Sequence, residues 1–199
     1  MLESLSVLVE NRAGVLNRVT SLFARRGYNI ESLAVGTTQD PAISRITITL
    51  SGDDELVRQI TRQLHKMPDI LMVRHLKSDE FFSRELVFIK VYADASTRSQ
   101  ILQVADIFRG HVIDVSPSTL TLELSGKEDK ISALQSLLEP YGIIELVRTG
   151  PIAIERGTRI MSVTPPGDMA PAHAQADDDS AVGVTPVKNK SDDWHKRKS

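Results

Sequence analysis

The sequence predicts an α+β chain made of two tandem βαββαβ units and a C-terminal tail, and three observations predict it. Segments with alternating apolar and polar residues, typical of strands, are interleaved with segments in which apolar residues recur at helical spacing. The same order of segments occurs twice, about 80 residues apart. After Gly157 both patterns end. We therefore expect domains at residues 1–79 and 84–157, followed by a disordered tail at residues 158–199.

The first unit reads as two helices and four strands. The elements expected are a strand around Leu5 to Val9, a helix from Val15 to Phe23 with Gly27 at its end, strands at 29–38 and 42–51, a helix at 51–67, and a strand at 70–76. In the third strand, Ile46, Ile48 and Leu50 alternate with polar residues, and Asp40-Pro41 marks the turn before it.

The second helix of this unit is expected to begin at Ser51 or Asp53, since both residue types cap helices. Its apolar face is predicted to consist of Leu56, Ile60, Leu64 and Met67.

The second unit repeats this order. The elements expected are a strand at 84–94, a helix with its apolar stripe at Ile101, Val104, Ala105 and Phe108, a strand pair within 111–126, a helix with its stripe at Ile131, Leu134, Leu137 and Leu138, and a strand at 143–149. Each unit is therefore ferredoxin-like, an antiparallel sheet with two helices on one face. Because each sheet leaves two edges and one face uncovered, we expect the units to pair with another copy of the chain.

The overall composition narrows the class of function. The formal net charge of −2 gives no general attraction to nucleic acid or to anionic membranes. The absence of cysteine excludes disulfides, thiolate metal sites and cysteine nucleophiles. No apolar run approaches the ~20 residues of a membrane span, and the N-terminus lacks the pattern of a signal peptide. We expect a cytoplasmic protein, or the mature core of an imported one, that binds neither nucleic acid nor membrane.

The segment 11–14, Asn-Arg-Ala-Gly, connects the first predicted strand to the first predicted helix. The first turn of that helix carries amide N–H groups without internal partners at the positive end of the helix dipole, which suits a carboxylate. Gly14 has no side chain to block close approach, and the Asn11 amide can both donate and accept. Local chemistry alone also allows a simple turn, so both interpretations remain open here.

Several longer motifs carry a resemblance to a known family. These are RGYNIESL at 26–33, the Asp-Pro turn, SRITI at 44–48, and FRGHVIDVSP at 108–117. With them, the first unit closely resembles the ACT domain of the small, regulatory subunits of acetohydroxyacid synthase, also called acetolactate synthase. The second unit is similar to the C-terminal domain of those subunits, and the resemblance covers residues 1–161.

The resemblance implies a regulator with no catalytic residues of its own. It implies that this chain binds and activates the large, catalytic subunit and confers feedback inhibition by valine or another branched-chain amino acid. It further implies a homodimer joined through the ACT domains, with the effector between two copies. Carried onto this sequence, Asn11, Gly14 and Val15 would line one side, and Asn29 and Ile30 of the other copy the second side.

Cofactors are expected only on the catalytic subunit, where the resemblance implies thiamine diphosphate, magnesium and FAD. In this chain we predict no metal site, because the histidines at 65, 75, 111, 173 and 195 have no metal-ligand spacing. The segment SGKED at 125–129 lacks the glycine and the hydroxyl residue of a phosphate-binding loop, and we interpret it as a turn and a helix start.

Three alternatives stand beside this interpretation. An independent enzyme lacks a recognisable catalytic constellation. An RNA-binding module shares the βαββαβ order, but it needs aromatic residues on its central strands, and the strand expected at 42–51 has none. The basic stripe Arg58, Arg62 and Lys66 is more simply interpreted as a solvent-exposed helix face. An ACT-type sensor of a different enzyme is the third alternative.

The second unit differs from the first at its strand-to-helix turn. Asp94 to Thr97 is expected to be an ordinary helix N-terminus, so no second effector site is predicted. By resemblance, residues 84–157 contribute to the contact with the catalytic subunit. The tail carries an acidic run at 177–179 and a basic end at 196–198, which suits a solubilising segment or a tethered contact.

Overall fold

The computed structural model describes residues 2–77 and 80–163. Residues 1–160 form one compact unit, and of the remaining segment only residues 161–163 are described. The prediction of a disordered tail therefore concerns residues that, from 164 onward, lie outside the described part of the chain. None of the helices within that part is long and apolar enough to cross a membrane.

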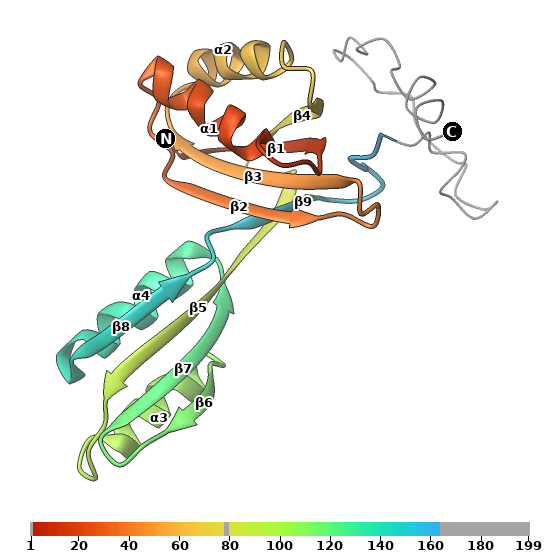
Figure 1. Cartoon of the computed structure of the whole chain (residues 1–199). Helices are drawn as coiled ribbons and strands as arrows, with labels where there is room; N and C mark the ends of the chain where they lie inside the picture. Colours follow the sequence, from red (N-terminus) through yellow and green to blue (C-terminus); the bar gives the residue numbers. More distant parts are fainter. Residues whose placement is uncertain (1, 78–79, 164–199) are drawn as a thin grey trace. The chain divides into compact units, whose positions relative to one another are not determined.

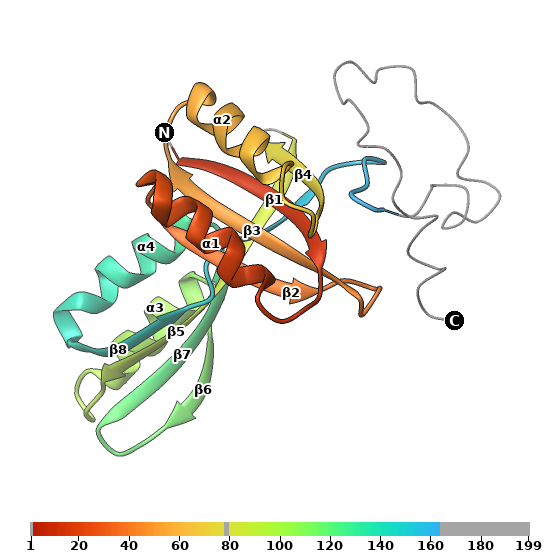
Figure 2. The same ribbon diagram turned by 45° about the horizontal axis from the view of Figure 1, so that its top comes forward.

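The first unit forms a four-stranded antiparallel sheet in the order β2-β3-β1-β4. Its elements are β1 (Leu2–Glu10), α1 (Val15–Arg26), β2 (Ser32–Thr37), β3 (Ile43–Ser51), α2 (Asp54–Leu64) and β4 (Ile70–Leu76). Both helices lie on the same face of the sheet (Figures 1 and 2). β2 and β4 are its edges.

The core of this unit lies between the sheet and the two helices. Alternate residues of β1 and β3 point toward α1 and α2 because side chains along a strand alternate between its faces. The buried core residues are Leu5, Val7, Val9, Val15, Val19, Leu22, Phe23, Ile46, Ile48, Leu50, Val57, Ile60 and Leu64. The helix α1 is thereby held with its first turn directly after the end of β1.

The second unit repeats the arrangement, with a sheet in the order β6-β7-β5-β8. Its elements are β5 (Phe81–Tyr92), α3 (Arg98–Ile107), β6 (His111–Val115), β7 (Thr119–Gly126), α4 (Glu128–Leu138), the 3₁₀ turn η1 (Glu139–Tyr141), β8 (Ile143–Arg148) and β9 (Ile152–Glu155). A second core joins α3 and α4 to one face of this sheet. The predicted fold class, two tandem ferredoxin-like units, is confirmed.

The structure also corrects several sequence-based expectations. The strand β9 was not predicted, nor was the start of β5, whose residues 81–84 pair with β9. The four residues Ile152–Glu155 are too short a segment for a strand signal, and they pair with residues 68 to 74 positions earlier in the chain. The strand expected at 29–38 covers only residues 32–37.

Two helices also face slightly differently from the prediction. In α2, Val57 is fully buried, whereas the predicted Leu56 is only partly buried and Met67 lies beyond the end of the helix. In α4, Leu137 is 49% exposed. In both cases a neighbouring residue of the same apolar run lies nearer the centre of the buried stripe, which a list of apolar positions does not resolve.

Candidate functional site

The turn after β1 is tied to the turn between β2 and β3. The backbone amide of Asn11 donates to the carbonyl of Ala42 at 2.7 Å, and its side-chain Nδ2 donates to the carbonyl of Pro41 at 2.8 Å. The Asn11 amide nitrogen is thus committed to holding the turn. Within the described residues its Oδ1 accepts no hydrogen bond and remains available as an acceptor.

Gly14 is the residue at the N-terminus of α1, and its backbone is left-handed, with φ 84° and ψ −12°. No side chain caps this helix end. Across the described part of the chain, the amides of Gly14, Leu16 and Asn17 have no acceptor, while the amide of Val15 donates to the Arg12 carbonyl at 3.3 Å. These amides lie at the positive end of the helix dipole, so the turn can bind a carboxylate.

The resemblance assigns Val15 a backbone role, with its amide on the ligand carboxylate, and in the structure this amide donates to the Arg12 carbonyl at 3.3 Å. The side chain of Val15 is 2% exposed and belongs to the core. The amides of Leu16 and Asn17, which the sequence interpretation did not name, are the ones left without acceptors. They follow from the helix start itself, because the first amides of any α-helix lack partners within it.

Arg18 stands beside this turn and was also missed. Its Nη1 lies 3.3 Å from the position that a β-carbon on Gly14 would occupy, and its Nε donates to Asp69 at 2.8 Å. The ion pair is partly exposed, and it holds a cationic group close to the amide cluster. A carboxylate bound at the turn would therefore also lie near a guanidinium.

The second predicted segment follows the other end of α1. Gly27, with φ 68°, ends the helix, and the exposed Asn29 donates from Nδ2 to Glu31 at 3.0 Å. Ser51 donates to the same Glu31 oxygen at 3.1 Å. Ile30 is partly buried and packs against the core. Glu31 thus organises this segment, although nothing in the sequence distinguished it from an ordinary exposed glutamate.

One chain does not bring the two predicted segments together. Asn11 is tied to the start of β3, whereas Asn29 lies near Ser51, the last residue of β3. The two segments also flank α1, whose 12 residues span about 18 Å. Asn11, Gly14 and Val15 form one group, and Asn29 and Ile30 form another at the opposite end of the sheet.

One group in the described part of the chain has the composition of a metal site. The donor atoms of Glu3, Asp54 and His75 lie within 4.8 Å of one another. The His75 ring nitrogen and the Glu3 carboxylate are 2.7 Å apart and form a hydrogen-bonded pair across β1 and β4. That pair gives His75 a structural role between β1 and β4.

The basic stripe on α2 is shorter than the sequence suggested. Arg58 pairs with Glu55 at 2.8 Å and both side chains are exposed, while Lys66 lies beyond the end of the helix at Leu64. The hydrogen bond and charge of Glu55 raise the pKa of Arg58. This arrangement is that of a solvated helix face.

Comparisons with known proteins agree with the architecture of both units. Residues 84–157 match a family model described as the small subunit of acetolactate synthase, and residues 5–72 match one described as an AHAS small subunit-like ACT domain. The chain is 49% identical, over 158 residues, to the probable acetolactate synthase small subunit of Methanothermobacter thermautotrophicus, covering 79% of this chain and 94% of that protein.

Two further relatives cover the same length. The acetolactate synthase small subunit of Mycolicibacterium smegmatis is 49% identical over 156 residues, which are 78% of this chain and 92% of that protein. The crystal structure of the acetolactate synthase small subunit from Thermotoga maritima superimposes with a TM-score of 0.75 at 36% identity, covering 80% of this chain and 99% of that one. The resemblance noted in the sequence is confirmed, and the chain belongs to the family of acetolactate synthase small subunits.

Proposed function

We propose that this chain is a regulatory subunit that activates the catalytic subunit of acetolactate synthase and makes it sensitive to feedback inhibition by valine or another branched-chain amino acid. Family membership supports the regulatory role, and the ACT domain supports an amino-acid effector. The second unit, residues 84–157, contributes to the contact with the catalytic subunit. Thiamine diphosphate, magnesium and FAD belong to that catalytic subunit.

The observation that carries the effector site is the left-handed turn at Gly14, with its amides that have no acceptor among the described residues. These amides and Arg18 suit the carboxylate of an amino acid. Asn11 Oδ1 suits its ammonium group. In the partner copy, Asn29 supplies a polar anchor and Ile30 an apolar contact for a branched side chain.

A symmetric dimer explains why the two segments lie at opposite ends of one chain. β2 is an edge strand, and the apolar Val35 on it is 48% exposed. If two copies pair antiparallel along β2, the Ser32 end of one strand meets the Thr37 end of the other. Asn29 precedes the Ser32 end, and the turn that holds Asn11 follows the Thr37 end. Twofold pairing therefore forms two equivalent sites from the two halves.

The mechanism is a coupling between two binding events. An effector that binds the inhibited arrangement more tightly by about 1–3 kcal/mol changes activity by roughly 5- to 150-fold at saturation. Linkage requires the reverse effect as well. The catalytic subunit must weaken effector binding whenever the effector disfavours the activating arrangement.

The test is acetolactate formation by the cognate catalytic subunit, measured with and without this chain across a valine titration, and repeated with leucine and isoleucine. We expect the chain to raise the rate and the effector to reverse that increase. A folded chain that changes neither rate nor feedback with its cognate subunit would contradict the proposal. The ACT domain would then serve a different enzyme.

A further inference from the structure

A two-stranded ribbon in this chain lies outside the strand order β6-β7-β5-β8 of the second unit, although it shares β5 with that sheet. It is formed by residues 81–84 of β5 and by β9, with Phe81 opposite Glu155 and Arg84 opposite Ile152. β5 then continues into the sheet of the second unit, where it pairs with β7 and β8. Two strands alone are marginally stable, so the contacts at the ends of the ribbon decide how rigidly it is held.

The first end of the ribbon is attached to the sheet of the first unit through Glu155. Its side chain is 7% exposed, and its Oε2 accepts a hydrogen bond from Arg74 Nη1 at 2.7 Å. Arg74 alternates with the core residue Val73 along β4, so it points to the sheet face opposite α1 and α2. Arg45 of β3 is also close to Glu155. Burial lowers the pKa of Arg45, and the negative charge of Glu155 partly offsets this effect.

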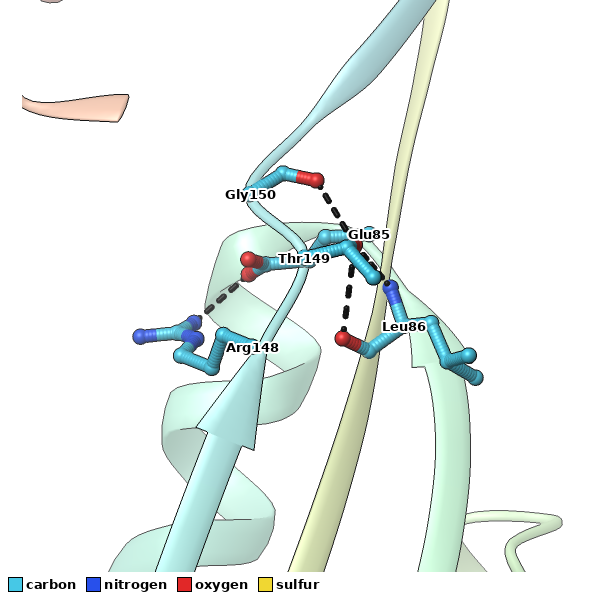
Figure 3. A network of polar contacts seen from close by, with 5 residues as sticks. All are labelled: Glu85, Leu86, Arg148, Thr149 and Gly150. Atoms are coloured by element: carbon cyan, nitrogen blue, oxygen red, sulfur yellow. Dashed lines mark hydrogen bonds and ion pairs between the residues drawn. The ribbon is translucent and has the colours of Figure 1, made fainter. Parts of the chain in front are cut away.

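Directly after the ribbon, Glu85 of β5 forms an ion pair with β8 of the second unit (Figure 3). Its side chain is 6% exposed and accepts a hydrogen bond from Arg148 Nη2 at 2.6 Å. Next to this pair, the hydroxyl oxygen of Thr149 accepts a hydrogen bond from the Leu86 amide at 3.1 Å. The backbone amide of Thr149 donates to the Leu86 carbonyl at 3.0 Å. Gly150, with φ 72°, then turns the chain into β9.

The connection between β8 and β9 is one residue longer than the segment of β5 opposite it. Arg148 lies opposite Val87 and Ile152 opposite Arg84, so residues 149–151 face only residues 85 and 86. An extra residue of this kind bends a strand pair locally. The Glu85–Arg148 pair lies at the bend and fixes it.

The two attachments are chemically alike. Each consists of a buried carboxylate, either Glu155 on the ribbon or Glu85 directly after it on β5, and an arginine of a neighbouring strand that is 29% exposed. A buried carboxylate that loses its arginine is strongly unfavourable, so each pair holds the ribbon in one orientation. In chain order β5 follows β4, so the ribbon contains the first strand after the ACT domain.

We propose that the Arg74–Glu155 and Glu85–Arg148 pairs are two clasps that make this ribbon the coupling element between the units. A change in the first unit on effector binding reaches the second unit because both clasps stay closed. This inference rests on the proposed function for its regulatory meaning. The clasp residues touch neither effector nor substrate, and they act by positioning the second unit.

The test uses the full chain with Glu155→Gln, Glu85→Gln and the double variant, assayed with the catalytic subunit. Glutamine keeps the shape and one acceptor but removes the charge. We expect activation without valine and the dissociation constant for valine to stay within about twofold, while the coupling between valine binding and activity falls roughly 2- to 30-fold. The double variant should lose little more than the worse single variant, because both clasps serve one element. Glu55→Gln, which breaks the exposed Arg58–Glu55 pair, is the matched control and should leave feedback unchanged.

Full feedback in the double variant would overturn the proposal, as would a loss of feedback that only follows a loss of valine binding. Urea unfolding gives a second readout that needs no ligand. With closed clasps the two units should unfold in one transition, and in the double variant in two. A wild-type chain that does not respond to valine would refute the proposed function alone. The clasps would then be judged by unfolding, where identical curves for wild type and double variant overturn them.

Discussion

The two repeats of this chain differ at the turn from the first strand to the first helix of each unit. In the first repeat Gly14 begins α1 without a side-chain cap, and neighbouring amides have no acceptor among the described residues. In the second repeat the Asp94 carboxylate accepts from the amides of Ser96 and Thr97 at 2.8 and 2.9 Å, just before α3. The second turn thus contains a carboxylate of its own.

The same fold can therefore leave amides without acceptors at this turn in one unit and bond them to a side chain in the other. The hydroxyl groups of Ser96 and Thr97 also donate to Asp94, at 2.6 and 3.0 Å. Arg98 donates to three backbone carbonyls around the turn, those of Ala93, Ser116 and Pro117. The amides of Ser96 and Thr97 are therefore already bonded to a carboxylate of the chain itself. The second turn lacks the Asn-x-x-Gly sequence of residues 11–14, and the Asp94 carboxylate accepts from two of its amides instead.

The largest effect is expected from placing a carboxylate in the first turn, with Gly14→Asp. The new carboxylate would stand at the amides and near Arg18, where the effector carboxylate is proposed to bind. Like charges held together cost several kcal/mol, so the valine concentration for half inhibition should rise more than about tenfold. Activation of the catalytic subunit should persist. The valine titration of acetolactate formation measures both.

Gly14→Asn is the matched control for this substitution. Asparagine has nearly the same shape as aspartate and tolerates the left-handed backbone at φ 84°, but it carries no charge. It should keep clearly more feedback than the aspartate variant. Equal loss in both variants would show that the backbone or the added volume matters and not the charge, and it would contradict a carboxylate site at this turn.

An intermediate effect is expected from mixing two defective chains. Gly14→Asp damages one half of the proposed site and Asn29→Ala damages the other. In a heterodimer of the two variants, one site combines both defects and the other combines two intact halves. Random exchange should therefore restore about a quarter of all effector sites. Isothermal titration with valine before and after subunit exchange measures this fraction.

The mixing experiment also tests the alternative that each chain binds an effector alone. A site within one chain would stay defective in every chain of the mixture, so no binding would return. The same result would follow if the two variants did not exchange, and mass spectrometry of differently labelled chains establishes that they do. Restored binding above a quarter would contradict the twofold arrangement.

The sequence predicts the fold well because its main signals are local. The alternation of Ile46, Ile48 and Leu50, and the left-handed Gly27 at the end of α1, are properties of neighbouring residues. The strand β9 shows the limit of such reasoning. It is a strand only because it pairs with residues 81–84, and pairing over that sequence distance leaves no local signature.

The candidate site could be predicted in type but not in detail. The unpaired amides after Gly14 follow from any uncapped helix start. Asn11 was a candidate from its local chemistry, whereas Asn29 came from the family resemblance alone. Arg18 and Glu31 could not be anticipated, since their places depend on Asp69 and Ser51, which the fold brings near. The ion pairs of the ribbon escaped prediction for the same reason.

The smallest effect is expected from opening the second turn with Asp94→Asn. The hydrogen bonds from Ser96 and Thr97 lower the pKa of Asp94 from its ordinary value of 3.8 to about 2. Because the folded state lowers this pKa, the charged carboxylate stabilises the fold at pH values above about 4. That contribution is lost as the pH falls toward 2. The group is exposed, so the difference in unfolding free energy between wild type and variant should be small.

Urea unfolding of both proteins between pH 7 and pH 2 measures this difference. The two stabilities should be separated by a constant amount near neutral pH and should converge as the pH falls from about 4 to about 2. Ser96→Ala removes one of the donors and should show a smaller separation that closes over the same range. A separation that persists at pH 2 would mean that the asparagine perturbs the turn by its shape, and the carboxylate would then not be what occupies these amides in the second repeat.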